Sequence, residues 1–325
     1  MAQNCHGGIY KLLHGVSTSN EGHMKKTFLI RSFFLAALGL TLVYGSHSMA
    51  LTNKDYSEAV QDVQDQIETL KDQSLNQCPS NYKKLFSGET LRISLFSGYQ
   101  NFDDDTADGM RARAMALNLQ KPCRPGIEAC GFSLVEKKPH VFRLKKNLEG
   151  KNVLLSIYST SVTDNNLEIM SSAKLQEEQA KQSQIVKNRF YKELVNSDIV
   201  FYTGHSRYGA GLGFDTQDPI PTLFKIITRI PLKPILAALA QKPSRLKVLG
   251  LFSCESEHYY RKDIEAANPG LSLILSKDDI EDVEAEQMAV GALNSLLSRK
   301  CDRDFNRAMI PEQNPSHHLM TYIRR

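Results

Sequence analysis

The sequence has little excess charge and few cysteines for its length. Its 325 residues carry 40 Lys and Arg against 36 Asp and Glu, a weak electrostatic footprint for nucleic-acid binding. Six cysteines are too few for a small scaffold built on disulfides. Hydrophobic residues make up 41% and charged residues 23%, which argues against a disordered, collagenous or multi-span membrane chain. The composition therefore predicts a globular protein without a nucleic-acid partner.

The apolar run near the N-terminus is too short to cross a membrane. It covers 33–44, about half of the ~20 residues that a span needs. A basic segment beginning at Met24 precedes it, and the small residues Ser48 and Ala50 follow. This order predicts an N-terminal extension and export signal over 1–50, with translation starting at Met24 and cleavage after Ala50. An uncleaved N-terminal anchor is the alternative; after cleavage no stable membrane span is expected.

Removal of the signal would change the cysteine count from even to odd. One of the six cysteines lies before Ala50, so the mature chain would carry five in a periplasmic or secreted compartment. Cys123 and Cys130 flank a Pro-Gly turn and are expected to pair, and Cys78 and Cys301 form the second expected pair. The fifth, Cys254, is then the candidate reactive thiol, with a buried structural cysteine as the plainer alternative.

Apolar runs and helical periodicity alternate along the chain. Strands are expected over 91–96, 132–135, 141–144, 153–158, 199–202, 246–252 and 271–275, and helices over 53–76, 109–119, 167–195, 232–240 and 283–297. This order predicts an α/β fold with a mostly parallel sheet, helices on both faces, a preceding helix and a β-hairpin insertion around Lys138-Pro139. The expected organisation is a packing helix within 51–84, one α/β domain over 85–310 and a tail over 311–325.

Two successive strands end in reactive side chains. The strand over 199–202 leads into Gly204-His205-Ser206, and the strand over 246–252 leads into Ser253-Cys254. Parallel neighbours would bring both ends to one sheet edge, where open α/β sheets bind ligands. A cysteine nucleophile needs a base and backbone N–H groups that face the oxyanion. The candidate catalytic residues are therefore His205 and Cys254, with Gly204 and Ser206 as backbone oxyanion donors.

These segments resemble the caspase-fold cysteine peptidases, the group that includes clostripain, gingipains, legumain and the metacaspases. The similarity lies in Tyr202-Thr203-Gly204-His205-Ser206, in Phe252-Ser253-Cys254, and in the element order from Leu91 to Leu297. The resemblance implies a caspase-like topology, a general acid/base role for His205 and a nucleophile role for Cys254. It also implies a peptide or protein substrate and no metal or organic cofactor.

The chain departs from this group in two places. Ser206 stands where a glycine usually follows the histidine, and the Gln-Ala-Cys-Arg-Gly stretch of caspases is absent, so aspartate specificity does not carry over. Three acidic residues near the site, Asp215, Glu255 and Glu257, are candidate cleft residues that would favour a basic substrate group. Solvated surface carboxylates are the plainer interpretation.

Two other functions fit parts of the same sequence. The Ser206 departure also suits a non-catalytic caspase-fold protein that binds or scaffolds. A serine hydrolase could combine Ser206, Asp278 and His317, although Tyr208 stands where the G-x-S-x-G elbow needs glycine.

Metal sites have weaker sequence signals. Cys254, His205 and His258 could bind zinc, but the chain has no paired C-x-x-C or H-x-x-x-H spacing. A calcium loop could begin at Asp104, but Met115 occupies its twelfth position, where glutamate is needed. We therefore expect no metal. The glycine-rich segment 209–213 is predicted to be a mobile loop beside the catalytic site.

Overall fold

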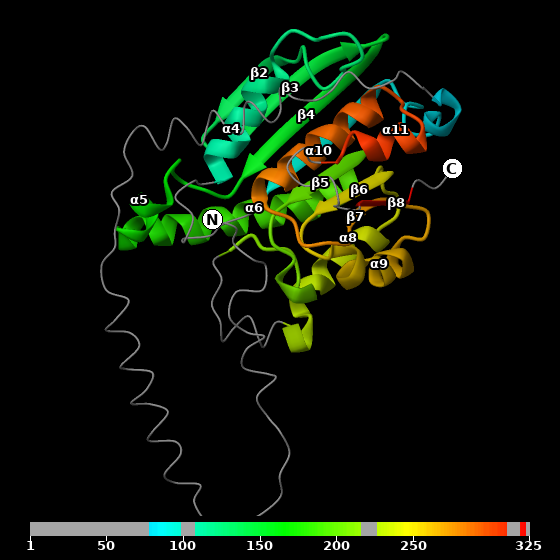
Figure 1. Ribbon diagram of the computed structural model, residues 1–325. Helices are drawn as coiled ribbons and strands as arrows, with labels where there is room; N and C mark the ends of the chain where they lie inside the picture. The colour runs from blue at the N-terminus through cyan, green and yellow to red at the C-terminus, as the bar shows by residue number, and fades with distance from the viewer. Residues whose placement is uncertain (1–77, 99–107, 216–225, 311–318, 323–325) are drawn as a thin grey trace, which may run out of the picture. The chain divides into compact units, whose positions relative to one another are not determined.

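The computed structural model describes residues 78–98, 108–215, 226–310 and 319–322, all within one compact unit (Figure 1). The second unit of the chain, His6–Asp55, lies outside these residues. The predicted export signal, the helix predicted over 53–76 and the first four positions of the possible calcium loop, 104–107, also lie outside them.

An eight-stranded sheet forms the centre of the fold, in the order β2-β3-β4-β1-β5-β6-β7-β8 (Figure 1). The strands are β1 Thr90–Ser97, β2 Ser133–Lys138, β3 Val141–Leu148, β4 Lys151–Ser159, β5 Ile199–Thr203, β6 Val248–Phe252, β7 Ser272–Ser276 and β8 Leu319–Tyr322. The five central strands β4, β1, β5, β6 and β7 are parallel to one another. The β2–β3 hairpin pairs antiparallel with β4, and β8 pairs antiparallel with β7. The predicted mostly parallel α/β fold with a hairpin is confirmed and is consistent with a caspase-like topology.

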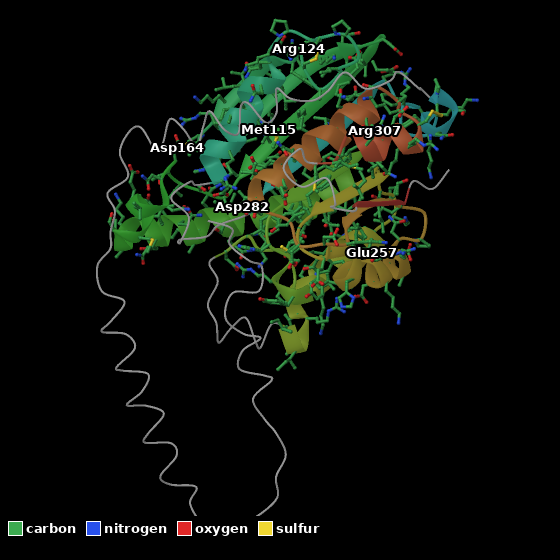
Figure 2. The ribbon with its side chains drawn as sticks, in the orientation of Figure 1. Met115, Arg124, Asp164, Glu257, Asp282 and Arg307 are labelled. Carbon is green, nitrogen blue, oxygen red and sulfur yellow. A yellow bond between two sulfur atoms is a disulfide. The ribbon has the colours of Figure 1, made fainter. Side chains whose placement is uncertain are left out.

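Helices cover both faces of the sheet. The longer ones are α4 Asp108–Leu119, α6 Ala173–Asn196, α8 Lys233–Ala240, α9 Ser256–Ala267 and α10 Asp282–Leu297. One hydrophobic core packs α4 and α10 against the sheet, and the other packs α6, α8 and α9 against it. Figure 2 marks the first group with Met115 and Asp282 and the second with Glu257. Every residue of β5 and β6 is buried, as expected for central strands.

The helix predicted over 167–195 is two helices. Residues Asn166–Met170 form α5, and α6 starts only at Ala173. Ser172 interrupts the pattern because its side-chain oxygen accepts the N–H of Leu175, 3.4 Å away, and caps α6. The prediction of one continuous helix over 167–195 was therefore wrong.

Three further elements have no counterpart in the predicted pattern. They are α9, α11 (Asp302–Arg307) and β8, which lies within the expected C-terminal tail over 311–325. Among the described helices, none has the length and hydropathy of a membrane span.

Both predicted disulfides are present. Cys78 is bonded to Cys301 and Cys123 to Cys130, each with 5.1 Å between Cα atoms. The first joins the short helix η1 (Pro79–Tyr82) to the start of α11, and the second closes the turn before β2.

Asp198 connects the amino ends of three central strands. Its carboxylate accepts the backbone N–H of Arg92 in β1 at 2.9 Å and contacts Lys247 Nζ, just before β6, at 2.9 Å. Its second cation is Arg245, at 2.8 Å, and its side chain is only 2% exposed. The backbone of Asp198 bonds to the same two strands, through its N–H to Arg92 and its carbonyl from Lys247. This buried carboxylate therefore holds β5 in register with both neighbours.

We predict that Asp198→Ala lowers the free energy of unfolding by roughly 2–3 kcal/mol, less than the cost of breaking a fully buried pair because both cations are partly exposed. The matched control is Asp263→Ala, which removes a more exposed ion pair with Arg229 (2.8 Å) and should cost under about 1 kcal/mol. Urea unfolding of both variants measures the difference. Equal costs would contradict the role of Asp198.

Candidate active site at the carboxyl edge of the sheet

The strands β5 and β6 end level with each other. Ile199 pairs with Val248 and Thr203 with Phe252, a constant offset of 49 residues. The N–H of Gly204 donates to the Phe252 carbonyl at 3.2 Å, which extends the pairing one residue further. His205 and Cys254 are also 49 residues apart, so each stands two residues beyond its own strand end. The structure thus brings both predicted residues to one sheet edge.

The backbone of His205 is clamped by its neighbours. Its carbonyl accepts the N–H of Gly213 at 3.0 Å and the hydroxyl of Tyr202 at 3.1 Å. A Cβ at position 213 would lie 3.1 Å from the Cβ of His205, so a glycine suits this close approach. The segment 209–213 is buried against the site. The glycines of this segment therefore serve close packing beside His205, and the predicted mobility of the loop stays a prediction.

A left-handed turn follows Ser206. Arg207, Tyr208 and Gly209 have φ values of 47°, 51° and 77°, a conformation that is strained for the two non-glycine residues. The Ser206 carbonyl anchors this turn by accepting the Gly209 N–H at 3.1 Å and the Tyr260 hydroxyl. The strain therefore begins after Ser206.

Of the two predicted oxyanion donors, Ser206 fits better than Gly204. The N–H of Gly204 is already bonded to Phe252, whereas that of Ser206 has no acceptor among the described residues. Ser206 has a φ of −85°, which any residue adopts, so the replacement of the usual glycine causes no backbone strain.

Burial and a nearby cation keep His205 neutral. Desolvation is the larger cause, and the charge of Arg207 the smaller, of a His205 pKa lowered to about 4. Arg207 is 6% exposed and forms an ion pair with Asp215 at 2.6 Å. At neutral pH the imidazole is therefore uncharged, and its unprotonated nitrogen can accept a proton.

Cys254 lies in the turn between β6 and α9. Its neighbour Glu255 is left-handed, with a φ of 46°, and donates its N–H to the Asp278 carbonyl at 3.0 Å. The Ser256 hydroxyl holds the turn by donating to Leu251 at 2.7 Å and accepting from Ser276 at 2.9 Å. Cys254 thus stands directly before Glu255, the N-cap residue of α9.

In the full chain Cys254 is disulfide-bonded. Its side chain is 7% exposed, and the sulfur lies 3.5 Å from the Ile280 carbonyl oxygen. The thiol predicted at this position belongs to the chain after cleavage at Ala50, and it stays a prediction. The odd cysteine count applied only to the sequence after Ala50, whereas the full chain has six cysteines.

The three predicted cleft carboxylates all have intramolecular partners. Asp215 pairs with Arg207, and Glu257 pairs with Arg261 at 2.9 Å. Glu255 accepts the hydroxyl of Tyr259 at 2.8 Å. These contacts account for the three residues without a substrate, and a preference for a basic substrate stays a prediction.

The metal alternatives gain no support. Within the described ranges, no group of three or more His, Cys, Asp or Glu side chains is placed to hold a metal ion, so Cys254, His205 and His258 do not form a ligand set. Asp108, the fifth position of the possible calcium loop, instead accepts the backbone N–H and the hydroxyl of Thr160 at 2.9 and 2.5 Å. Burial raises the pKa of this carboxyl to about 7.

The serine-hydrolase alternative is not assembled by the described residues. His317 lies outside them, and the backbone carbonyl of Asp278 supports Glu255 beside Cys254. The sequence interpretation missed two residues that shape the site, Arg207 and Tyr260. Tyr260 had a detectable signal, since Tyr260, Ile264 and Ala267 have the spacing of a helix face.

No family model, curated protein or solved structure matches this chain. The resemblance to caspase-fold peptidases therefore stays a prediction, based on two short segments and the element order.

We predict that His205 titrates near pH 4 in an NMR titration. Because the unfolded chain takes up this proton nearer the ordinary value of 6.5, the contribution of neutral His205 to stability is full above pH 6.5 and declines as the pH falls towards 4. The unfolding free energy of the wild type relative to His205→Gln should therefore fall over this window. A titration midpoint near 6.5 with a pH-independent difference would refute this.

Proposed function

We propose that this protein is an exported, cysteine peptidase-like hydrolase in which Cys254 is the nucleophile and His205 the general acid/base. The observation that carries the proposal is the β5–β6 register, which sets both residues equally far beyond neighbouring parallel strands. Ligands bind at this edge in open α/β sheets.

Each step of acyl transfer has a candidate group. Neutral His205 takes the proton of the Cys254 thiol, and the sulfur attacks the carbonyl carbon of a peptide bond. The N–H of Ser206 donates to the tetrahedral oxyanion. The imidazolium then protonates the leaving amine, and water hydrolyses the thioester to release the acid and restore the thiol. The α9 N-terminus favours the thiolate, while Arg207 returns His205 to its neutral form.

The reaction requires the Cys254 sulfur as a thiol, so its disulfide in the full chain must be absent or opened in the active form. The predicted cleavage after Ala50 would supply a chain with a different cysteine complement. The two disulfides at Cys78–Cys301 and Cys123–Cys130 are compatible with an oxidising compartment. Redox state and processing thus decide whether the site is active.

A non-catalytic binding protein is the second candidate. The observation that favours it is the disulfide at Cys254, since an oxidised sulfur cannot attack a carbonyl. In this case the strained turns at Arg207-Tyr208 and Glu255 would shape a binding edge.

Labelling of the exported chain tests the choice. We expect a peptidyl acyloxymethyl ketone to modify Cys254, as located by mass spectrometry, and Cys254→Ala to abolish the label. Loss of the base in His205→Ala should slow labelling by roughly 10²–10⁴-fold. The matched control is His258→Ala, which removes an imidazole on α9 that contacts Tyr259 and should leave the rate unchanged.

Two results would reject the peptidase. One is a Cys254 that remains disulfide-bonded in the exported chain and resists labelling after mild reduction. The other is an equal labelling rate in His205→Ala and His258→Ala. Either result would leave the binding protein as the better account.

A further inference from the structure

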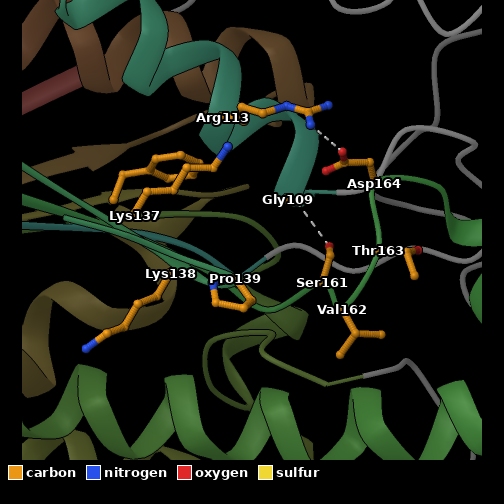
Figure 3. Close-up of a pocket in the computed structure, with 10 residues that line it drawn as sticks. Gly109, Arg113, Lys137, Lys138, Pro139, Ser161, Val162, Thr163 and Asp164 are labelled. Atoms are coloured by element: carbon orange, nitrogen blue, oxygen red, sulfur yellow. Dashed lines mark hydrogen bonds and ion pairs between the residues drawn. The ribbon is translucent and has the colours of Figure 1, made fainter. Parts of the chain in front are cut away.

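A cavity of about 470 Å³, whose lining residues are drawn in Figure 3, includes neither His205 nor Cys254. It lies at the ends of β4 and the β2–β3 hairpin, beside the first turn of α4. Because β4 and β5 are separated only by β1, the cavity is two strand spacings, roughly 10 Å, along the edge from the strand that ends at His205. Its lining is Gly109, Arg113, Lys137, Lys138, Pro139, Phe142 and Ser161–Asp164.

The lining carries an excess of positive charge. Three cations, Arg113, Lys137 and Lys138, face one carboxylate, Asp164. Arg113 is paired with Asp164 at 2.7 Å, and Lys138 is paired with Glu136, outside the lining. For Lys137 the contact that the structure records is with an aromatic ring, the centroid of Phe142 at 5.9 Å. The charge of Lys137 is therefore not neutralised by an ion pair among the described residues.

The side-chain directions distinguish the two lysines. Figure 3 shows the Lys137 ammonium turned toward Arg113, whereas Lys138 extends away from the other labelled groups. Lys137 and Arg113 thus both contribute positive charge to the lining, which also includes the apolar side chains of Phe142 and Val162.

Ser161 adds a hydrogen-bond donor. Its oxygen accepts the N–H of Gly109 at 3.1 Å, which leaves the hydroxyl hydrogen for an incoming acceptor (Figure 3). Its backbone carbonyl is held by His140 Nδ1 at 3.0 Å. Burial lowers the pKa of His140, so the imidazole is uncharged at neutral pH and adds no positive charge to the cavity.

We propose that this cavity binds a ligand with an oxyanion group, a carboxylate or a phosphate. Lys137 and Arg113 supply the charge, and Ser161 donates a hydrogen bond. Asp164 competes with the ligand for Arg113, so the ion pair must loosen when the anion binds. This site uses none of the groups assigned to acyl transfer and does not depend on the proposed function.

The test is calorimetric titration of the full chain at low salt, with inorganic phosphate in one arm and succinate in the other. We expect saturable binding in at least one arm, and the tighter arm identifies the type of anion. Lys137→Ala and Arg113→Ala should each weaken binding at least tenfold. Asp164→Asn should tighten it several-fold by releasing Arg113, a gain that misfolding would not produce.

The matched control is Lys138→Ala, which removes the same charge from the same cavity. It should change the affinity by less than twofold. The proposal is overturned if neither anion binds saturably, if the two lysine variants weaken binding equally, or if Asp164→Asn does not tighten it. The titration is repeated with Cys254→Ala, which removes the proposed nucleophile and should leave the anion affinity unchanged. The result for the anion site is thereby independent of the result for the peptidase proposal.

Discussion

The buried carboxylate of Asp198 is the contact on which the arrangement of the site depends. It bonds to Arg92, near the start of β1, and to Lys247, just before β6 begins. Because Asp198 itself directly precedes β5, three parallel strands share one anchor at their amino ends. Asp198 precedes His205 by the same seven residues that separate Lys247 from Cys254. Because both strands rise equally per residue, the register set at one edge is carried to the other.

The opposite edge combines strain, burial and charge in a few residues. Left-handed Arg207, Tyr208 and Glu255 stand directly beyond β5 and β6, and strain of this kind gathers at functional sites. Burial and, to a smaller extent, the charge of Arg207 lower the pKa of His205, and α9 begins two residues after Cys254. A sheet that is buried on both faces supplies the rigid support for these turns.

Apolar runs and cysteine spacing predicted most of the framework. Strands such as β5 and β6 are buried on both faces and read as unbroken apolar runs, and the Cys123–Cys130 turn is local. The break at Ser172 depends on a cap, which a continuous polar pattern conceals. Whether Cys254 is a thiol or part of a disulfide could not be predicted from the odd or even number of cysteines, because that number depends on which residues remain in the chain. The packing of 209–213 on His205 depends on tertiary contacts that glycine spacing does not reveal.

The central claim is that His205 and Cys254 are neighbours, and NMR of the histidine side chains tests it directly. The imidazole nitrogens of the exported chain are observed before and after mild reduction and alkylation of Cys254 with iodoacetamide. The account predicts a clear change in the shifts of His205 and none in those of His140, which lies beside Ser161. An alkylated Cys254 with an unchanged His205 would contradict it.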